Sequence, residues 1–202
     1  MCNSFRDAET AALELFPSIV PIGPLFADAE LLKPVGQLLP EDTGCLRWLD
    51  AQPDGSVVYV AFGSLAAYDA AQLDELAEGL LLTSRAFLWV VRPGSAGDQL
   101  LEQLRRRAAP RGRVVSWCPQ QSVLAHPAVA CFLTHCGWNS TMEAVRSGVP
   151  LLCWPCFTDQ FLNQSYICDV WGTGLKVPAT HGTGARGERS CSGQDRGAAR
   201  RQ

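Results

Sequence analysis

Val129-Ala-Cys-Phe-Leu-Thr134 is followed in the sequence by His135-Cys-Gly-Trp-Asn-Ser140, and this stretch decides the fold. Its first half is a continuous apolar run with the length of a buried strand. Its second half is a polar turn with a glycine, and we predict a helix over 140–147. A strand that passes through such a turn into a helix is the repeating unit of a parallel α/β sheet.

The same unit recurs on both sides of this stretch. Asp69-x-x-Gln72 has the form of a helix cap, and leucines and an alanine at helical spacing follow it. The strands that we predict are 56–62, 87–91, 113–116, 129–134, 149–154 and 174–177, and helices are predicted from Asp69, from Asp98 and over 119–125, 140–147 and 158–170. This alternation predicts an α/β protein with a Rossmann-like, doubly wound parallel sheet.

Changes in composition along the chain predict three parts. Residues 1–55 are rich in proline and are expected to form an interdomain linker with short elements. Residues 56–177 carry the α/β pattern. Residues 178–202 contain no large apolar side chain, so we expect this tail to be disordered.

The overall composition limits the kinds of partner and the location that we expect for this protein. The net charge of −3 favours neither a nucleic acid nor a membrane surface as a partner. Met1 is followed by Cys-Asn-Ser-Phe-Arg-Asp without the apolar core of a signal peptide. No apolar run approaches the roughly 20 residues of a membrane span, so we expect a cytoplasmic protein.

Nine cysteines, an odd number, lie mostly within apolar runs. We interpret them as buried free thiols in a reducing compartment. Cys153 and Cys156 have the spacing of a redox or metal pair, but no second pair has zinc spacing, and the structural interpretation is favoured.

Polar and aromatic residues follow the predicted strands where each strand ends. In a parallel sheet these ends share one edge, where ligands bind. The residue types suit a nucleotide-sugar, with an aromatic face for a base, a glycine-containing turn at a helix start for phosphate, and acceptors for hydroxyls. The residues are Gly63-Ser64, Trp117, the turn 135–140 with Glu143, and Asp159-Gln160.

Each of these positions also has a structural interpretation. Ser140-x-x-Glu143 has the spacing of a capping box, which explains both residues as helix-start chemistry. Thr158-Asp159 fits the cap and first turn of a helix, and Trp117 fits a core residue. The spacing alone leaves these alternatives open.

Three absent motifs narrow the class of protein. No G-x-G-x-x-G follows a strand, which counts against a nicotinamide oxidoreductase. No Walker A sequence is present, which counts against an NTPase. No Asp-x-Asp cluster is present either, so neither a metal ion nor a cofactor is expected.

A much longer pattern spans Trp117 to Gln160. Trp117-Cys-Pro-Gln-Gln-Ser-Val-Leu-Ala-His126, Phe132-Leu-Thr-His-Cys-Gly-Trp-Asn-Ser-Thr-Met-Glu143 and Trp154-Pro-Cys-Phe-Thr-Asp-Gln160 closely resemble the sugar-donor box of plant secondary-product UDP-glycosyltransferases. Pro21-Ile-Gly-Pro-Leu25 resembles the interdomain segment of that family. The resemblance covers roughly residues 2–177. It implies the C-terminal, donor-binding domain of a GT-B fold, a UDP-sugar as donor and a small-molecule hydroxyl as acceptor.

The resemblance also implies roles for individual residues. Trp117 would stack on uracil, with the Cys118 backbone and Gln120 nearby, and Glu143 would bind the ribose hydroxyls. The diphosphate would be held by His135, Asn139, Ser140 and Ser64. The sugar hydroxyls would be bound by Trp138, Asp159 and Gln160. The last position of the box is Gln160, and in this it is similar to family members that prefer UDP-glucose. The resemblance therefore implies UDP-glucose as the donor.

The chain departs from the family pattern at both ends. We expect the N-terminal domain with its acceptor pocket and catalytic histidine to be missing, and we assign no catalytic residue to His126, His135 or His181. After Val177 the family continues with another amphipathic helix, whereas here the apolar periodicity stops, and we interpret the tail as aberrant. The alternative function is therefore a non-catalytic fragment that binds UDP-sugar or a protein partner without transferring sugar.

Overall fold

The computed structural model describes residues 1–25, 42, 44–63, 69–92, 98–109 and 111–178. The chain divides into two compact units, Met1–Pro40 and Glu41–Gln202. Within the first unit lie the short helices η1 (Arg6–Ala8) and α1 (Thr10–Leu15) and an isolated bridge between Cys2 and Pro21. Apart from Pro178, the tail predicted to be disordered lies outside the described residues.

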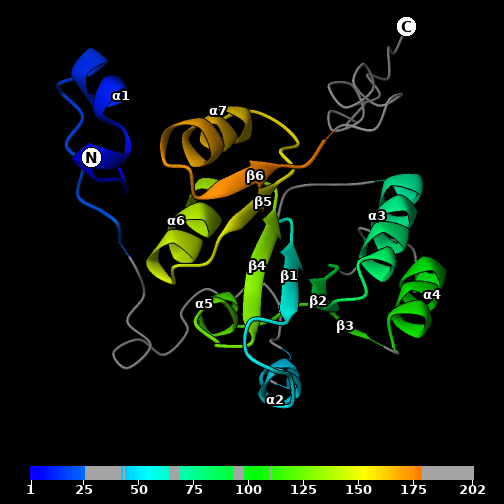
Figure 1. Ribbon diagram of the computed structural model, residues 1–202. Helices are drawn as coiled ribbons and strands as arrows, with labels where there is room; N and C mark the ends of the chain where they lie inside the picture. The colour runs from blue at the N-terminus through cyan, green and yellow to red at the C-terminus, as the bar shows by residue number, and fades with distance from the viewer. Residues whose placement is uncertain (26–41, 43, 64–68, 93–97, 110, 179–202) are drawn as a thin grey trace, which may run out of the picture. The chain divides into compact units, whose positions relative to one another are not determined.

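The second unit contains a six-stranded sheet in which every pair of neighbouring strands is parallel (Figure 1). This confirms the predicted fold class. The strands are β1 (Val57–Ala61), β2 (Ala86–Val90), β3 (Gly112–Val115), β4 (Val129–Thr134), β5 (Leu151–Cys153) and β6 (Gly174–Lys176).

The strand order is β3-β2-β1-β4-β5-β6. From β1 the chain builds outward through β2 to β3, then returns to place β4 on the other side of β1 and builds outward again to β6. The direction of winding therefore changes between β1 and β4. In open parallel sheets of this order, ligands bind beyond the carboxyl ends of the strands at that switch point.

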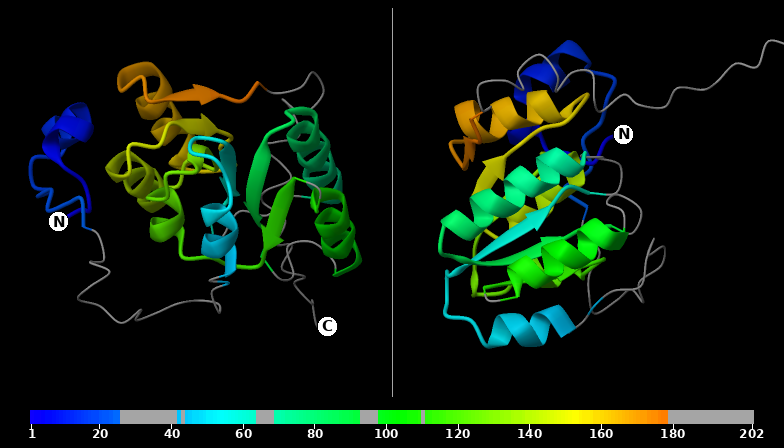
Figure 2. Two further views of the ribbon diagram at one scale, coloured as in Figure 1. Left: turned by 60° about the horizontal axis from the view of Figure 1, so that its bottom comes forward. Right: turned by 90° about the vertical axis from the view of Figure 1, so that its right-hand side faces the viewer.

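Two apolar cores cover the two faces of the sheet. The side chains of β1 alternate between them, with Val57 and Tyr59 in one core and Val58 and Val60 in the other, which is why this strand reads as a continuous apolar run. The first core is completed by α2 (Gly44–Asp50), α5 (Gln120–Leu124), α6 (Trp138–Arg146) and η2 (Tyr166–Val170). The second is completed by α3 (Ala70–Leu82) and α4 (Asp98–Ala108), which lie side by side (Figure 2).

Two helices differ by more than one residue from their predicted bounds, whereas α5 (Gln120–Leu124) is one residue shorter at each end than the predicted 119–125. α6 begins at Trp138, two residues before the predicted start, because Gly137 takes the extended backbone of an N-cap residue. The helix predicted over 158–170 is divided into α7 (Gln160–Ser165) and the π-helical turn η2. In that turn the Trp171 amide donates to the Tyr166 carbonyl at 2.8 Å. The predicted cap of α3 is confirmed as a capping box between Asp69 and Gln72.

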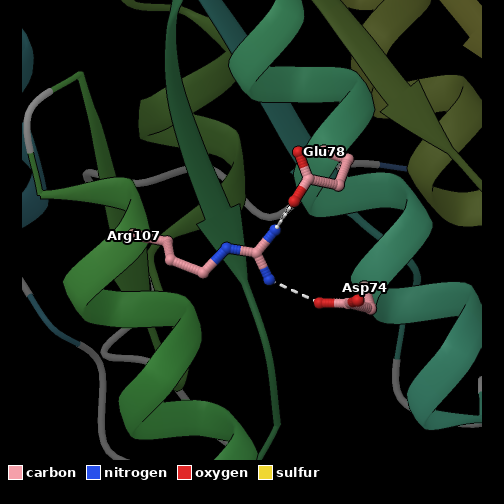
Figure 3. Close-up of polar contacts among 3 residues, drawn as sticks. All are labelled: Asp74, Glu78 and Arg107. Carbon is pink, nitrogen blue, oxygen red and sulfur yellow. Dashed lines mark hydrogen bonds and ion pairs between the residues drawn. The ribbon is translucent and has the colours of Figure 1, made fainter.

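A surface ion-pair cluster joins α3 to α4. The Arg107 guanidinium of α4 contacts the carboxylates of Asp74 and Glu78, which lie one turn apart on α3 (Figure 3). Both carboxylates are exposed, so this cluster contributes little to stability compared with the apolar contacts of Leu73, Leu80 and the other core residues beneath it.

Most cysteines match the prediction of free thiols. Within the described residues seven are free, four of them buried as predicted and three half-buried (Cys2, Cys131 and Cys168). Cys153 is among the free thiols, so the Cys153-x-x-Cys156 pair is not closed into a disulfide. Within the described residues, no group of three or more His, Cys, Asp or Glu side chains is placed to hold a metal ion. The helices in those ranges include none that is long and apolar enough to cross a membrane.

Candidate donor-binding site

The carboxyl edge of the sheet brings together residues from distant parts of the sequence. Gly63 follows β1, Trp117 follows β3, His135 follows β4, and Asp159 lies in the loop that follows β5. Because all the strands are parallel, these positions lie at one edge. Ser64, the remaining residue predicted from the ends of the strands, lies outside the described residues.

The His135 side chain lies at the switch point between β1 and β4, enclosed by two glycines. A Cβ atom placed on Gly63 would lie 2.6 Å from His135 Nε2, and one placed on Gly137 would lie 2.4 Å from the same atom. Any larger side chain at either position would collide with the imidazole. The two glycines therefore let the turns after β1 and β4 close on the histidine, which is only 8% exposed.

Burial keeps His135 neutral at physiological pH. Loss of hydration disfavours the imidazolium and lowers the pKa of His135 to about 4. The Asp159 carboxylate raises this pKa and the positive charge of Arg92 lowers it, and both effects are smaller than the effect of burial. A neutral imidazole is available as a hydrogen-bond donor and acceptor, but it brings no positive charge to a ligand.

A hydrogen-bonded group lies between the starts of α5 and α6. The Gln120 side-chain amide donates to Ser140 Oγ at 3.0 Å and to Glu143 Oε2 at 2.7 Å. The other carboxylate oxygen, Glu143 Oε1, accepts from Gln121 Nε2 at 3.1 Å. The predicted residues Gln120, Ser140 and Glu143 are thus in direct contact.

Tyr59 supports this group from the core. Its hydroxyl donates to Gln120 Oε1 at 3.0 Å and lies 3.3 Å from Cys118 Sγ. Burial raises the pKa of Tyr59 well above its usual value, so the phenol stays protonated and keeps its donor. Nothing in the local pattern distinguishes Tyr59 from its apolar neighbours on β1, and the sequence analysis did not select it.

The start of α6 settles the alternative interpretation of Ser140 and Glu143. The N-cap residue is Gly137 and makes no side-chain cap, so Ser140 lies inside the first turn. The capping-box interpretation is therefore wrong. Ser140 is instead a buried hydroxyl bonded to Gln120, and Asn139 is exposed in the same turn. Free backbone N–H groups and the helix dipole at this end favour an anion.

Trp117 is held through its backbone. Its carbonyl accepts from the Asp42 amide at 2.9 Å. The Asp42 carboxylate accepts from Arg113 Nη2 at 3.0 Å and from the Gly44 amide at 2.8 Å. Trp117 is half-buried, so its indole is not wholly enclosed in the core. The following residue, Cys118, is buried.

The indole of Trp138 belongs to an aromatic cluster with Trp171 and Tyr166. Its ring centroid lies 6.2 Å from that of Trp171, which in turn lies 5.8 Å from Tyr166. The structure therefore gives this side chain a packing partner at the end of η2.

Asp159 immediately precedes α7 and Gln160 begins it, and their side chains differ in exposure. Gln160 is only 4% exposed, and its Oε1 accepts from the amides of Cys156 and Phe157 at 2.8 and 3.0 Å. Asp159 is exposed, and its carboxylate makes no cap on α7. It is held instead by Thr158 and Asn163. Asn163 was not selected from the sequence, although its i+4 spacing from Asp159 on a predicted helix was a signal.

The sequence matches a known family over nearly its whole length. The family model described as UDP-glucoronosyl and UDP-glucosyl transferase matches residues 4–181. UDP-glycosyltransferase 83A1 of Arabidopsis thaliana is 50% identical over 178 residues, which make up 87% of this chain and 37% of that protein. DIMBOA UDP-glucosyltransferase BX8 of Zea mays is 54% identical over 140 residues, which make up 67% of this chain and 30% of that protein.

Solved structures agree with the sequence match. The structure of Os79 from O. sativa in complex with UDP superposes with a TM-score of 0.80 and 40% identity, over 89% of this chain and 42% of that one. This chain therefore spans about two fifths of the length of these relatives, and it aligns to part of their GT-B fold. On this evidence the chain belongs to the plant UDP-glycosyltransferase family and corresponds to a C-terminal portion of its members.

Proposed function

We propose that the carboxyl edge of this sheet binds a UDP-sugar, UDP-glucose above others, as the donor half of a glycosyltransferase that acts with inversion on a small-molecule hydroxyl. The observation that carries the proposal is the bonded group of Gln120, Ser140 and Glu143 beside the start of α6. It lies at the switch point of a Rossmann-type sheet, in a chain whose relative Os79 has been solved with UDP.

The proposed nucleotide contacts follow from the donors and acceptors present. A carboxylate has about four acceptor sites, and in Glu143 two are occupied by glutamine amides. The others are available to the two hydroxyls of a ribose. Trp117, held at its backbone by Asp42, offers a ring face to uracil.

The proposed diphosphate contacts are the first turn of α6 with Asn139 and Ser140, and the neutral imidazole of His135. Ser64 is proposed here on its sequence position alone. The sugar hydroxyls are assigned to Asp159 and to Gln160, whose Oε1 is engaged with backbone and whose amide NH2 is the remaining donor. We propose no metal ion and no cofactor for this step.

Calorimetric titration of the whole chain with UDP and with UDP-glucose tests the donor site. We expect binding in the micromolar to millimolar range. Glu143→Ala is expected to weaken it at least about tenfold, because charged hydrogen bonds to the ribose are lost. Trp117→Ala is expected to weaken it by a similar factor through loss of stacking.

Glu75→Ala is the matched control, because Glu75 is an exposed carboxylate on α3 and is not one of the proposed site residues. Its affinity for both ligands should equal that of the unchanged chain. A folded protein that binds neither UDP nor UDP-glucose, or that binds them equally well after Glu143→Ala, would show that the site is assigned wrongly.

A second candidate is UDP-sugar binding without transfer by this chain. The observation in its favour concerns the two histidines within the described residues. His126 accepts from the Ala128 amide through Nδ1 at 3.2 Å and faces Asp50 through Nε2 at 3.2 Å, so both ring nitrogens are engaged. His135 is enclosed between two glycines. Neither is placed as a general base with open access to an acceptor hydroxyl.

We therefore expect no glucoside when the chain is incubated with UDP-glucose and a panel of phenolic acceptors. Chromatography with mass detection of the glucoside makes the measurement, and heat-inactivated protein gives the background. Product above this background, lost in Glu143→Ala, would reject the binding-only candidate and show that these residues support transfer by themselves.

A further inference from the structure

The Asp159 carboxylate is held at both of its oxygens. Thr158 Oγ1 donates to Asp159 Oδ1 at 2.9 Å, and Asn163 Nδ2 donates to Asp159 Oδ2 at 3.0 Å. The two donors come from the residue before Asp159 and from the next turn of α7. An exposed carboxylate held at one oxygen can still rotate, whereas donors at both oxygens define the plane of the group.

Asn163 also connects this carboxylate to the turn after β4. Its Nδ2 makes a second hydrogen bond, to the Cys136 carbonyl at 2.9 Å, so both hydrogens of the amide are used. The side chain is only 4% exposed. One buried amide thus joins the loop before α7 to the turn that carries His135 and Gly137.

Backbone strain marks the same two segments. Thr158 has φ of +52° and Cys136 has φ of +64°, in the left-handed region that residues with a Cβ rarely adopt. A β-branched residue such as Thr158 is especially unfavourable there. Such conformations persist where the surrounding structure requires them, and they concentrate at ligand sites.

Helix capping does not explain this arrangement. Asp159 precedes α7 with a helical backbone, and its side chain accepts no bond from the first-turn amides. Its two donors are side chains, and its remaining acceptor sites are exposed. The carboxylate is therefore oriented for a partner outside the helix.

We propose that Thr158 and Asn163 are positioning residues of the donor site, which hold the Asp159 carboxylate in the orientation that accepts hydrogen bonds from the sugar hydroxyls. Asn163 has a second role. Its bond to Cys136 fixes the position of Asp159, which binds the sugar, relative to the turn after β4, which binds the diphosphate. This inference rests on the proposed function, and it adds two residues that do not themselves contact the donor.

The decisive test compares Thr158→Val with Thr158→Ser in titrations with UDP and UDP-glucose. Valine keeps the β-branched shape and removes the hydroxyl, whereas serine keeps the hydroxyl. We expect Thr158→Val to weaken UDP-glucose binding about three- to tenfold and to change UDP binding far less, because UDP has no hexose. Thr158→Ser should recover most of the lost affinity. Thr158 is exposed, so these changes do not disturb the core.

An Asp159→Ala background separates positioning from direct contact. If Thr158 acts through Asp159, Thr158→Val should cause no further loss of UDP-glucose affinity once the carboxylate is gone. Asn163→Ala should lower the affinity for both UDP and UDP-glucose, because it also removes the hydrogen bond to the Cys136 carbonyl. The Thr158 pair decides the inference even if Asn163→Ala does not fold.

The outcomes distinguish this inference from the function on which it rests. If UDP fails to bind the unchanged chain, the proposed function and the inference both fall. If UDP and UDP-glucose bind but Thr158→Val leaves UDP-glucose affinity unchanged, or weakens both ligands equally, the donor site stands and the positioning role is rejected.

Discussion

Replacing Gly63 with alanine is expected to lower the free energy of unfolding by about 3 kcal/mol and to abolish UDP binding. Two costs add. A residue with a Cβ at φ of +67° costs roughly 1–2 kcal/mol. The new methyl group would also lie 2.6 Å from His135 Nε2, and overpacking of this kind costs about 1–3 kcal/mol. Urea unfolding of the whole chain, with titration of UDP, measures both effects.

The chain offers a closely matched control. Gly148 also has φ of +67°, but no atom lies within 4 Å of a Cβ built there. Gly148→Ala should therefore show only the backbone cost and retain UDP binding. Combining Gly63→Ala with His135→Ala should remove the steric part and leave the backbone part. If Gly63→Ala and Gly148→Ala destabilise equally, the imidazole is not enclosed as described.

Acidification is expected to destabilise the protein through His135 by roughly 3 kcal/mol between pH 6.5 and pH 4. The imidazole has a pKa near 6.5 when exposed, and its pKa is lowered to about 4 in the folded protein, chiefly by burial. Between these values the unfolded chain binds more protons than the folded chain. The free energy of unfolding therefore falls as the pH falls through this window. Above about pH 6.5 the imidazole is neutral in both states, and no stability is lost through His135.

Other groups titrate in the same range, so the informative quantity is the difference in the free energy of unfolding between the unchanged chain and a variant that lacks the imidazole. Urea unfolding at several pH values, for the unchanged chain and for His135→Gln, isolates the histidine. The two curves of stability against pH should converge toward pH 4, because glutamine has no proton to gain. Parallel curves would mean that His135 is not buried as a neutral group. UDP affinity of the unchanged chain should not depend on His135 protonation above about pH 5.5.

The secondary structure was predictable because its signals are local. The apolar run 56–62 has the length of a strand covered on both faces, and the observed β1 does alternate between two cores. Asp69 and Gln72 predicted a cap, and the structure has both of its hydrogen bonds. The boundaries were not predictable in the same way, since the helix predicted over 158–170 is divided into α7 and a π-helical turn.

The edge of the sheet at which the predicted site residues lie was predictable, but the contacts among them were not. Parallel strands bring their carboxyl ends to one edge whatever the strand order, which placed Trp117, His135 and Asp159 correctly at that edge. The spacing Ser140-x-x-Glu143 was ambiguous, because a capping box and a ligand site use the same residues. Only the observed start of α6 at Trp138 excluded the cap.

The sequence by itself determined the repeated strand–helix pattern, the parallel sheet and the family, because these depend on periodicity and on motifs read within short windows. The tertiary structure alone decided the contacts between distant segments: Tyr59 with Gln120, 61 residues apart, His135 between Gly63 and Gly137, and Asn163 with Cys136. Such contacts depend on strand order, on register and on the exclusion of water, none of which is encoded in any local stretch of the chain.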